Sequence, residues 1–126
     1  MSHGMSDGVY FFDTYAFFEI IRGNPKYEKY QNSKIITTVF NLAELNYNLK
    51  KEASKKIADE ITEKYKESVV KVSFEEVKEA IDLKTKNRDY SLPDAIGYTV
   101  AKSHGVKFLT GDSGFEKFDN VEYVKK

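Results

Sequence analysis

The run Val9-Tyr10-Phe11-Phe12, followed at once by Asp13, decides how we interpret the fold. Consecutive apolar and aromatic residues in so short a stretch are typical of a strand that is buried on both faces, as in a parallel sheet. Four other short runs combine apolar residues in a similar way, and we expect each of them to be a strand: residues 34–37, 68–72, 106–110 and 121–124.

Helical patterns fill most of the chain between these strands. Apolar residues recur there every three or four positions, and Ser, Gly or Pro mark several of the ends. The predicted helices cover residues 14–22, 38–50, 52–66, 73–86 and 91–104. Strands that alternate with helices of this length predict an α/β fold, in which a central, mainly parallel sheet has helices on both faces. We therefore expect a three-layer α/β/α sandwich.

Length and composition set the domain organisation. The 126 residues fit one domain of ordinary size. Hydrophobic residues make up 40% of the chain and aromatic residues 14%, which is enough to build a core and argues against a disordered chain. The absence of cysteine excludes disulfides, thiolate zinc sites and a cysteine nucleophile. Residues 1–5 look like an added leader, so we expect a single domain over residues 6–126.

The charges of the chain balance. Twenty Lys and Arg residues match twenty Asp and Glu residues, so the large positive excess of many nucleic-acid-binding proteins is missing. Affinity for a polyanion must then come from an uneven placement of charges or from bound cations. The apolar runs are far shorter than the ~20 residues that a membrane span needs, and no signal-peptide core follows a basic start. We expect a cytoplasmic protein without a membrane segment.

Four acidic residues fall at positions where an α/β sheet presents its ligand site. Two of them follow predicted strands and two lie in the first half of predicted helices. They are Asp13, Glu44, Asp94 and Asp112. Ligands of open α/β sheets bind beyond the carboxyl ends of the strands. Carboxylates gathered there would repel one another unless a divalent cation neutralised them, and oxygen ligands with few imidazoles favour Mg²⁺ or Mn²⁺.

Taken singly, each acid also has a purely structural interpretation. Asp13 could cap a helix, and Asp112 could shape a turn between glycines. Asp94 could stabilise the start of a helix through a favourable interaction with the helix dipole. Glu44 is different, because its neighbours on the helix are aromatic and amide side chains rather than lysines. The expected convergence of all four at one sheet edge is what favours a functional site.

At this point the sequence resembles the PIN-domain ribonucleases, and by size their VapC-like toxins from toxin–antitoxin systems. The resemblance rests on four segments that occur in the family's order between Val9 and Phe118: residues 9–13, 37–45, 92–96 and 109–115. It implies a PIN-like fold and a metal-dependent endoribonuclease that cleaves RNA phosphodiester bonds. It also implies that the four acids hold one or two Mg²⁺ or Mn²⁺ ions and that Thr110 positions the water or the acid cluster. Many relatives carry a fifth acid where this chain has Gly114.

The same resemblance implies partners, namely an RNA substrate, a small antitoxin protein and a second copy of the chain in a homodimer. Two related functions remain open: a stand-alone RNA-processing nuclease and a non-catalytic PIN-like binding module. A phosphotransfer domain on a similar sheet is disfavoured, because the residue two positions after Asp13 is Tyr15 rather than a second acid.

Other side chains have two interpretations that the sequence leaves open. The apolar residues Phe17, Phe18 and Ile21 could face a partner or the core. Basic residues that could guide RNA, or simply end helices, are Arg22, Lys26, Lys86, Arg88 and Lys102. Tyrosines that could stack on bases, or simply pack, are Tyr15, Tyr47, Tyr90 and Tyr98.

Overall fold

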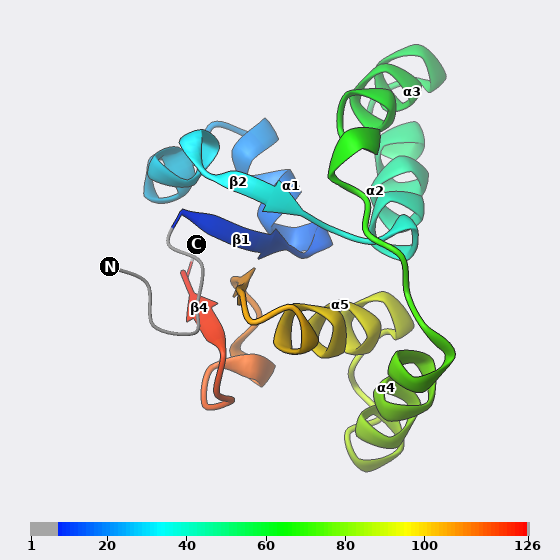
Figure 1. Ribbon diagram of the computed structural model, residues 1–126. Coiled ribbons are helices and arrows are strands. Elements are labelled where there is room, and N and C mark those ends of the chain that lie inside the picture. Colours follow the sequence, from blue (N-terminus) through cyan, green and yellow to red (C-terminus); the bar gives the residue numbers. More distant parts are fainter. Residues whose placement is uncertain (1–7, 126) are drawn as a thin grey trace.

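The computed structural model describes residues 8–125 (Figure 1). Its sheet has four parallel strands in the order β2-β1-β3-β4. The strands are β1 (Val9–Phe12), β2 (Lys34–Ile36), β3 (Lys107–Thr110) and β4 (Val121–Tyr123). The two central strands, β1 and β3, are therefore the ones that Asp13 and Asp112 follow. The predicted leader at residues 1–5, and the predicted start of the domain at residue 6, lie outside the described residues.

Five α-helices and three short 3₁₀ segments surround this sheet within the described chain. The α-helices are α1 (Thr14–Ile21), α2 (Val39–Glu52), α3 (Lys55–Lys64), α4 (Phe74–Lys86) and α5 (Leu92–Ser103). The 3₁₀ segments are η1 (Pro25–Asn32), η2 (Lys66–Ser68) and η3 (Ser113–Phe115). Each α-helix begins with a side-chain oxygen that accepts a hydrogen bond from the first turn: Asp13, Thr38, Ser54, Ser73 and Ser91.

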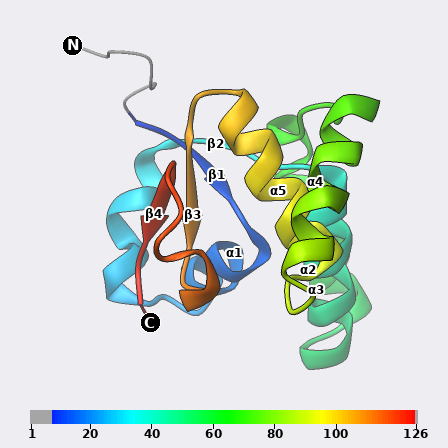
Figure 2. The ribbon, with the colours of Figure 1, turned by 90° about the horizontal axis from the view of Figure 1, so that it is seen from below.

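The alternation of side chains along β1 and β3 creates a core on each face of the sheet. Phe11 and Phe108 pair in register and pack into one core with α4 and α5. Phe12 and Leu109 point to the opposite face and pack with α1, η1, α2 and α3. In Figure 2, α5 lies on one side of the strands and η1 on the other. The predicted three-layer α/β/α sandwich is confirmed.

Helix α5 approaches the sheet unusually closely, and a glycine makes this possible. A Cβ atom at Gly97 would lie 2.9 Å from Cε1 of Phe11 and 3.2 Å from Cε1 of Phe108. Both rings are completely buried, so neither has free space to move into. The close packing fixes the position of the first turn of α5, which carries Asp94.

The predicted strand at residues 68–72 is wrong. Ser68 ends η2, and Val69 forms only an isolated parallel bridge with Thr37. Two backbone hydrogen bonds, from Thr37 N to Ser68 O (3.0 Å) and from Val70 N to Thr37 O (2.9 Å), hold this bridge before the chain leaves for α4. Val70 and Val72 pack against the core below α4 and α5 while Lys71 is exposed. The segment therefore has the alternating burial of a strand but lacks the series of backbone hydrogen bonds that defines one.

Burial separates the apolar residues of α1 whose role the sequence left open. Phe17 and Phe18 are buried in the core on the α1 face, whereas Ile21 is 38% exposed, so the first two are packing residues. Within residues 8–125, no helix has the length and apolar character needed to cross a membrane.

Candidate active site

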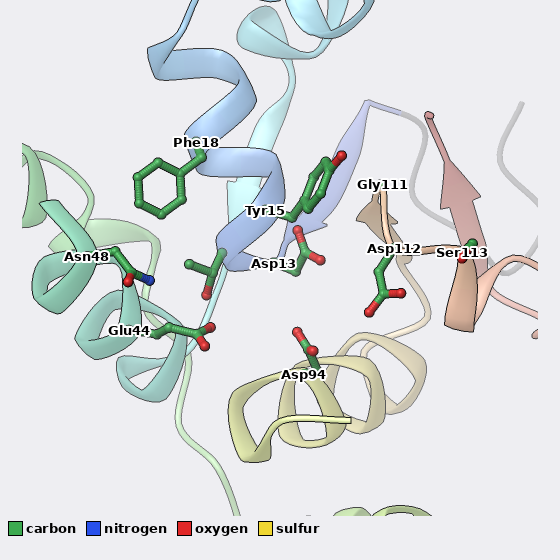
Figure 3. Close-up of a pocket in the computed structure, with 10 residues that line it drawn as sticks. Asp13, Tyr15, Phe18, Glu44, Asn48, Asp94, Gly111, Asp112 and Ser113 are labelled. Carbon is green, nitrogen blue, oxygen red and sulfur yellow. The ribbon is translucent and has the colours of Figure 1, made fainter. Parts of the chain in front are cut away.

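The four predicted acids line one pocket. It lies beyond the carboxyl ends of β1 and β3 and has a volume of about 530 Å³. Its lining also includes hydroxyl, amide and aromatic side chains; in full it comprises Asp13, Thr14, Tyr15, Phe18, Glu44, Asn48, Asp94, Gly111, Asp112 and Ser113. Figure 3 shows the carboxylates of Asp13, Glu44, Asp94 and Asp112 turned toward a common space.

Asp13 is the most deeply buried of these acids, with 1% of its surface exposed. Its Oδ1 atom accepts a hydrogen bond from the backbone N–H of Ala16 at 2.7 Å, so it caps α1 as well as lining the pocket. Burial raises the pKa of Asp13 well above its ordinary value, and the nearby charges of Asp94 and Asp112 raise it further. Hydrogen bonds from the Thr110 side chain and from Ala16 N oppose this rise.

Thr110 connects two of the acids. Its side chain is fully buried and hydrogen-bonds to the carboxyl group of Asp13. Its Oγ1 atom also accepts a hydrogen bond from the backbone N–H of Asp112 at 3.1 Å. A hydroxyl group can donate and accept at the same time, which is what this position requires.

Asp94 lies in the first turn of α5, where its backbone N–H donates to the Ser91 hydroxyl at 3.1 Å. Burial raises the pKa of Asp94 from its ordinary value of 3.8 to about 6. The charges of Glu44 and Asp112 add to this rise, and hydrogen bonds with Ser91 reduce it. The acids of the pocket therefore disfavour one another's ionisation.

Glu44 and Asp112 enter the pocket from opposite sides (Figure 3), and both are partly exposed. Asp112 follows β3 and begins η3, where its Oδ1 atom accepts a hydrogen bond from the backbone N–H of Gly114 at 2.9 Å. Glu44 projects from the second turn of α2. The backbone of Gly114 thus orients the carboxyl group of Asp112.

A buried amide, which the sequence analysis did not select, fixes the helix that carries Glu44. Asn41 is fully buried, and its Oδ1 atom accepts a hydrogen bond from the Thr38 hydroxyl at 2.6 Å. Its Nδ2 group donates to the carbonyl of Pro93 at 3.3 Å, and its own carbonyl accepts from the Thr14 hydroxyl at 3.3 Å. Asn41 thus connects the first turns of α1, α2 and α5. Asp13 caps α1, and Glu44 and Asp94 belong to the other two helices.

The donor set fits a hard divalent cation. Its functional atoms are carboxylate oxygens, and no imidazole lines the pocket. Within the described chain, however, no three acidic or histidine side chains are already arranged to hold an ion. The carboxylates would have to draw closer around a cation, and Glu44 and Asp112 are exposed enough to rotate. His104 is an exposed residue at the end of α5, outside the pocket lining.

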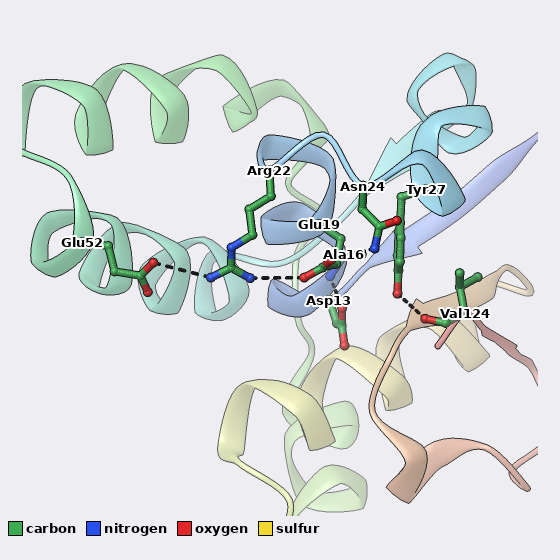
Figure 4. A network of polar contacts seen from close by, with 8 residues as sticks. All are labelled: Asp13, Ala16, Glu19, Arg22, Asn24, Tyr27, Glu52 and Val124. Carbon is green, nitrogen blue, oxygen red and sulfur yellow. Dashed lines mark hydrogen bonds and ion pairs between the residues drawn. The ribbon is translucent and has the colours of Figure 1, made fainter. Parts of the chain in front are cut away.

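Positive charge does not line this pocket, and several of the predicted RNA-guiding residues have partners elsewhere. Arg22 bridges the 5%-exposed Glu19 at 3.1 Å and Glu52 at 3.5 Å (Figure 4). Lys26 donates to the carbonyl of Lys125, and Lys102 pairs with Asp119. An anionic ligand would therefore meet acids first, and a cation would have to mediate the contact.

The predicted tyrosines separate into three groups. Tyr90 and Tyr98 are buried packing residues whose hydroxyl groups donate to the carbonyl of Gly114 and to Asp119. Tyr47 is 62% exposed, outside the pocket lining. Only Tyr15 among the four lines the pocket with the acids.

Solved structures with the same fold include a toxin–antitoxin complex and a toxin. A chain of a toxin–antitoxin complex from Klebsiella pneumoniae is similar with a TM-score of 0.71 and 16% sequence identity, covering 90% of this chain and 95% of that one. VapC20 from Mycobacterium tuberculosis, described as a toxin that cleaves the sarcin–ricin loop, has a TM-score of 0.73 and 18% identity, covering 93% and 98%. At these identities the likeness establishes the fold.

Sequence comparison with curated proteins finds no match. The family model of the PIN domain, in contrast, matches residues 10–121. The matched region contains all four acids of the pocket, the whole of β2 and β3, β1 without Val9, and the first residue of β4. The chain therefore belongs to the PIN domain family.

Proposed function

We propose that this protein is a metal-dependent endoribonuclease that cleaves RNA phosphodiester bonds. Asp13, Glu44, Asp94 and Asp112 would hold Mg²⁺ or Mn²⁺, and Thr110 would position the acids. The observation that carries the proposal is the convergence of these acids in one pocket of a PIN-family chain. The raised pKa values of Asp13 and Asp94 support it, because a bound cation would offset both the burial of their charge and the repulsion among the acids that raise them.

Several residues in and next to the pocket have distinct parts in the proposed reaction. A bound cation would supply charge neutralisation at the scissile phosphate and lower the pKa of a water molecule for in-line attack. Asp13, held by Ala16 N and Thr110, provides a rigid carboxylate at the floor of the pocket. Glu44 and Asp112 provide carboxylates that can adjust, because they are partly exposed. Asn41 acts through Glu44 by fixing the start of α2.

The proposed enzyme is a cytoplasmic VapC-like toxin that binds a small antitoxin protein. Its fold likeness to a toxin–antitoxin complex and to a toxin that cleaves the sarcin–ricin loop supports this choice. A stand-alone RNA-processing nuclease would share the same pocket and differ in having no antitoxin. A non-catalytic binding module would keep the fold and bind RNA without cutting it.

Wild-type protein is expected to cleave a pool of structured RNAs in Mn²⁺ and to lose this activity in EDTA. Asp94→Asn removes one carboxylate near the centre of the pocket and should lower cleavage at least about tenfold. Asp82→Asn is the matched control, because Asp82 is an exposed residue of α4 away from the pocket. If the wild type binds RNA but does not cleave it in Mg²⁺ or in Mn²⁺, the non-catalytic binding module is favoured instead.

Homodimer formation is the second expectation for the proposed toxin. The outer side of α4 exposes Phe74, at 87%, and Ile81, at 39%, which lie two helical turns apart on one side of the helix. Exposed apolar side chains on one face are typical of a protein interface. Light scattering should give twice the chain mass for the wild type, and Phe74→Ser should shift the mass toward that of the monomer. A monomeric wild type at micromolar concentration would contradict this expectation.

A further inference from the structure

Tyr15 occupies a place in the acidic pocket that the proposed chemistry does not use. It is the second residue of α1, two positions after Asp13, and lines the pocket with the four acids. Figure 3 places its ring beside Asp13, on the side of Gly111 and Asp112. The residue is partly exposed, whereas its neighbours Thr14 and Ala16 are buried. An aromatic ring therefore borders the space into which the carboxylates point.

The ring is held in place by the backbone of Gly111. A Cβ atom at position 111 would lie 2.2 Å from Cε1 and 2.7 Å from Cζ of Tyr15, and 2.8 Å from the hydroxyl oxygen of Tyr27. Gly111 is not among the glycines with positive φ, so close approach of the ring is what the missing side chain permits. Tyr27 is fixed in turn, because its hydroxyl group donates to the carbonyl of Val124 at 2.6 Å (Figure 4).

This arrangement suits a flat apolar ligand better than a charged one. The acids repel anions, and no Lys or Arg lines the pocket, so a nucleic acid must present its phosphates to a cation. The base next to that phosphate needs a separate contact. A tyrosine ring offers such a contact to any base, since every base has a stacking face. A ring already held against Gly111 loses little freedom when the base arrives.

We propose that Tyr15 is the nucleobase-binding residue of this site, and that its ring stacks on the base beside the scissile phosphate. The proposal rests on the proposed nuclease function and adds the group that holds the substrate. Because stacking does not read the edges of a base, Tyr15 sets affinity for unpaired RNA rather than a strict sequence.

Direct observation of stacking uses the wild-type protein. A single-stranded oligoribonucleotide that carries 2-aminopurine at successive positions is titrated with protein in Ca²⁺, a hard cation that takes carboxylate ligands. The fluorescence of 2-aminopurine falls when it stacks on an aromatic ring, so we expect a loss of at least about half of the signal at one position. Binding of the oligoribonucleotide without a fluorescence change at any position overturns the proposal.

Variants then assign the stacking to the ring. Tyr15→Leu is expected to abolish the fluorescence change and to raise KM for cleavage in Mn²⁺ about tenfold, with kcat within about twofold of wild type. Tyr15→Phe keeps the ring and should behave as the wild type. The control is Tyr47→Leu, which removes an exposed ring outside the pocket lining and should change neither quantity.

The outcomes separate this proposal from the one on which it rests. If the wild type neither cleaves nor binds RNA in any divalent cation, the nuclease function fails and Tyr15 has no substrate. If the wild type cleaves RNA and Tyr15→Leu matches Tyr47→Leu in KM and fluorescence, only the role of Tyr15 is wrong. A Tyr15→Phe variant as impaired as Tyr15→Leu would assign the contact to the hydroxyl group and overturn stacking.

Discussion

Asp13→Asn is expected to lower RNA cleavage in Mn²⁺ by about a hundredfold or more, while the protein in EDTA stays as stable as the wild type or becomes more stable. The loss of activity follows because the substitution removes the negative charge from the most buried acid of the pocket. The gain in stability follows because the buried carboxylate is disfavoured by desolvation and by the charges of Asp94 and Asp112.

The asparagine can replace the structural contacts of Asp13. Its Oδ1 atom can still accept the hydrogen bond from Ala16 N, and asparagine is as good a helix cap as aspartate. Its Nδ2 group can donate to Oγ1 of Thr110, because a hydroxyl oxygen has two lone pairs and the Asp112 N–H uses one of them. The substitution therefore separates the charge of Asp13 from its role in the fold.

Two measurements check this expectation together: cleavage rates in Mn²⁺ and thermal unfolding in EDTA. Asp13→Ala is the informative companion, because it removes both the charge and the helix cap and should be about 1 kcal/mol less stable than Asp13→Asn. Cleavage by Asp13→Asn at the wild-type rate would remove Asp13 from the proposed metal site. A large loss of stability would mean that the fold itself requires the carboxylate.

The convergence of the acids could be predicted because it depends on topology. Parallel strands place their carboxyl ends at one edge, so Asp13 after β1 and Asp112 after β3 must be neighbours once those strands pair. The helix starts that follow β2 and precede β3 come to the same edge and bring Glu44 and Asp94. None of this needs knowledge of side-chain packing.

The contacts that stabilise the pocket could not be predicted, because they join residues distant in the chain through side-chain geometry. Asn41 bonds to Pro93, 52 positions away, and nothing near Asn41 in the sequence indicates that partner. The packing of Tyr15 on Gly111 is equally nonlocal. The wrong strand at residues 68–72 has the same origin. The alternation of apolar and polar residues can be recognised in this segment alone. Whether a neighbouring strand is present to form hydrogen bonds with it depends on the rest of the fold.

The predicted helix over residues 52–66 has the wrong bounds, although the sequence contains a local signal for its true start. The structure ends α2 at Glu52 and begins α3 at Lys55. Between them, the Ser54 hydroxyl accepts a hydrogen bond from Ile57 N at 3.1 Å and caps the new helix. A serine three residues before an apolar position is a helix-start pattern, so this boundary was available from the sequence.

The second large effect concerns pH: in EDTA, the Asp94 carboxyl group should make the free energy of unfolding fall as the pH rises from about 4 to about 7. The pKa of Asp94 is raised from 3.8 to about 6 in the folded state, so the folded protein holds the proton more tightly than the unfolded chain. The resulting stabilisation is fully present below pH 4 and is lost as the pH rises through 6. A shift of this size in a largely buried group corresponds to about 3 kcal/mol, at about 1.4 kcal/mol for each pKa unit. Asp13, whose pKa is also raised, contributes with the same sign.

Comparison with Asp94→Asn isolates this contribution from those of other groups. Asp59 and Asp119 have lowered pKa values and oppose the trend, but they do so equally in both proteins. The variant should be more stable than the wild type at pH 7 in EDTA and nearly equal to it at pH 4, as measured by urea unfolding. Mn²⁺ should reverse the order at pH 7, because a cation binds the ionised carboxylates of the wild type and stabilises the folded state in proportion to its occupancy. Parallel pH curves for the two proteins, with and without Mn²⁺, would contradict both the burial of charge at Asp94 and its place in a metal site.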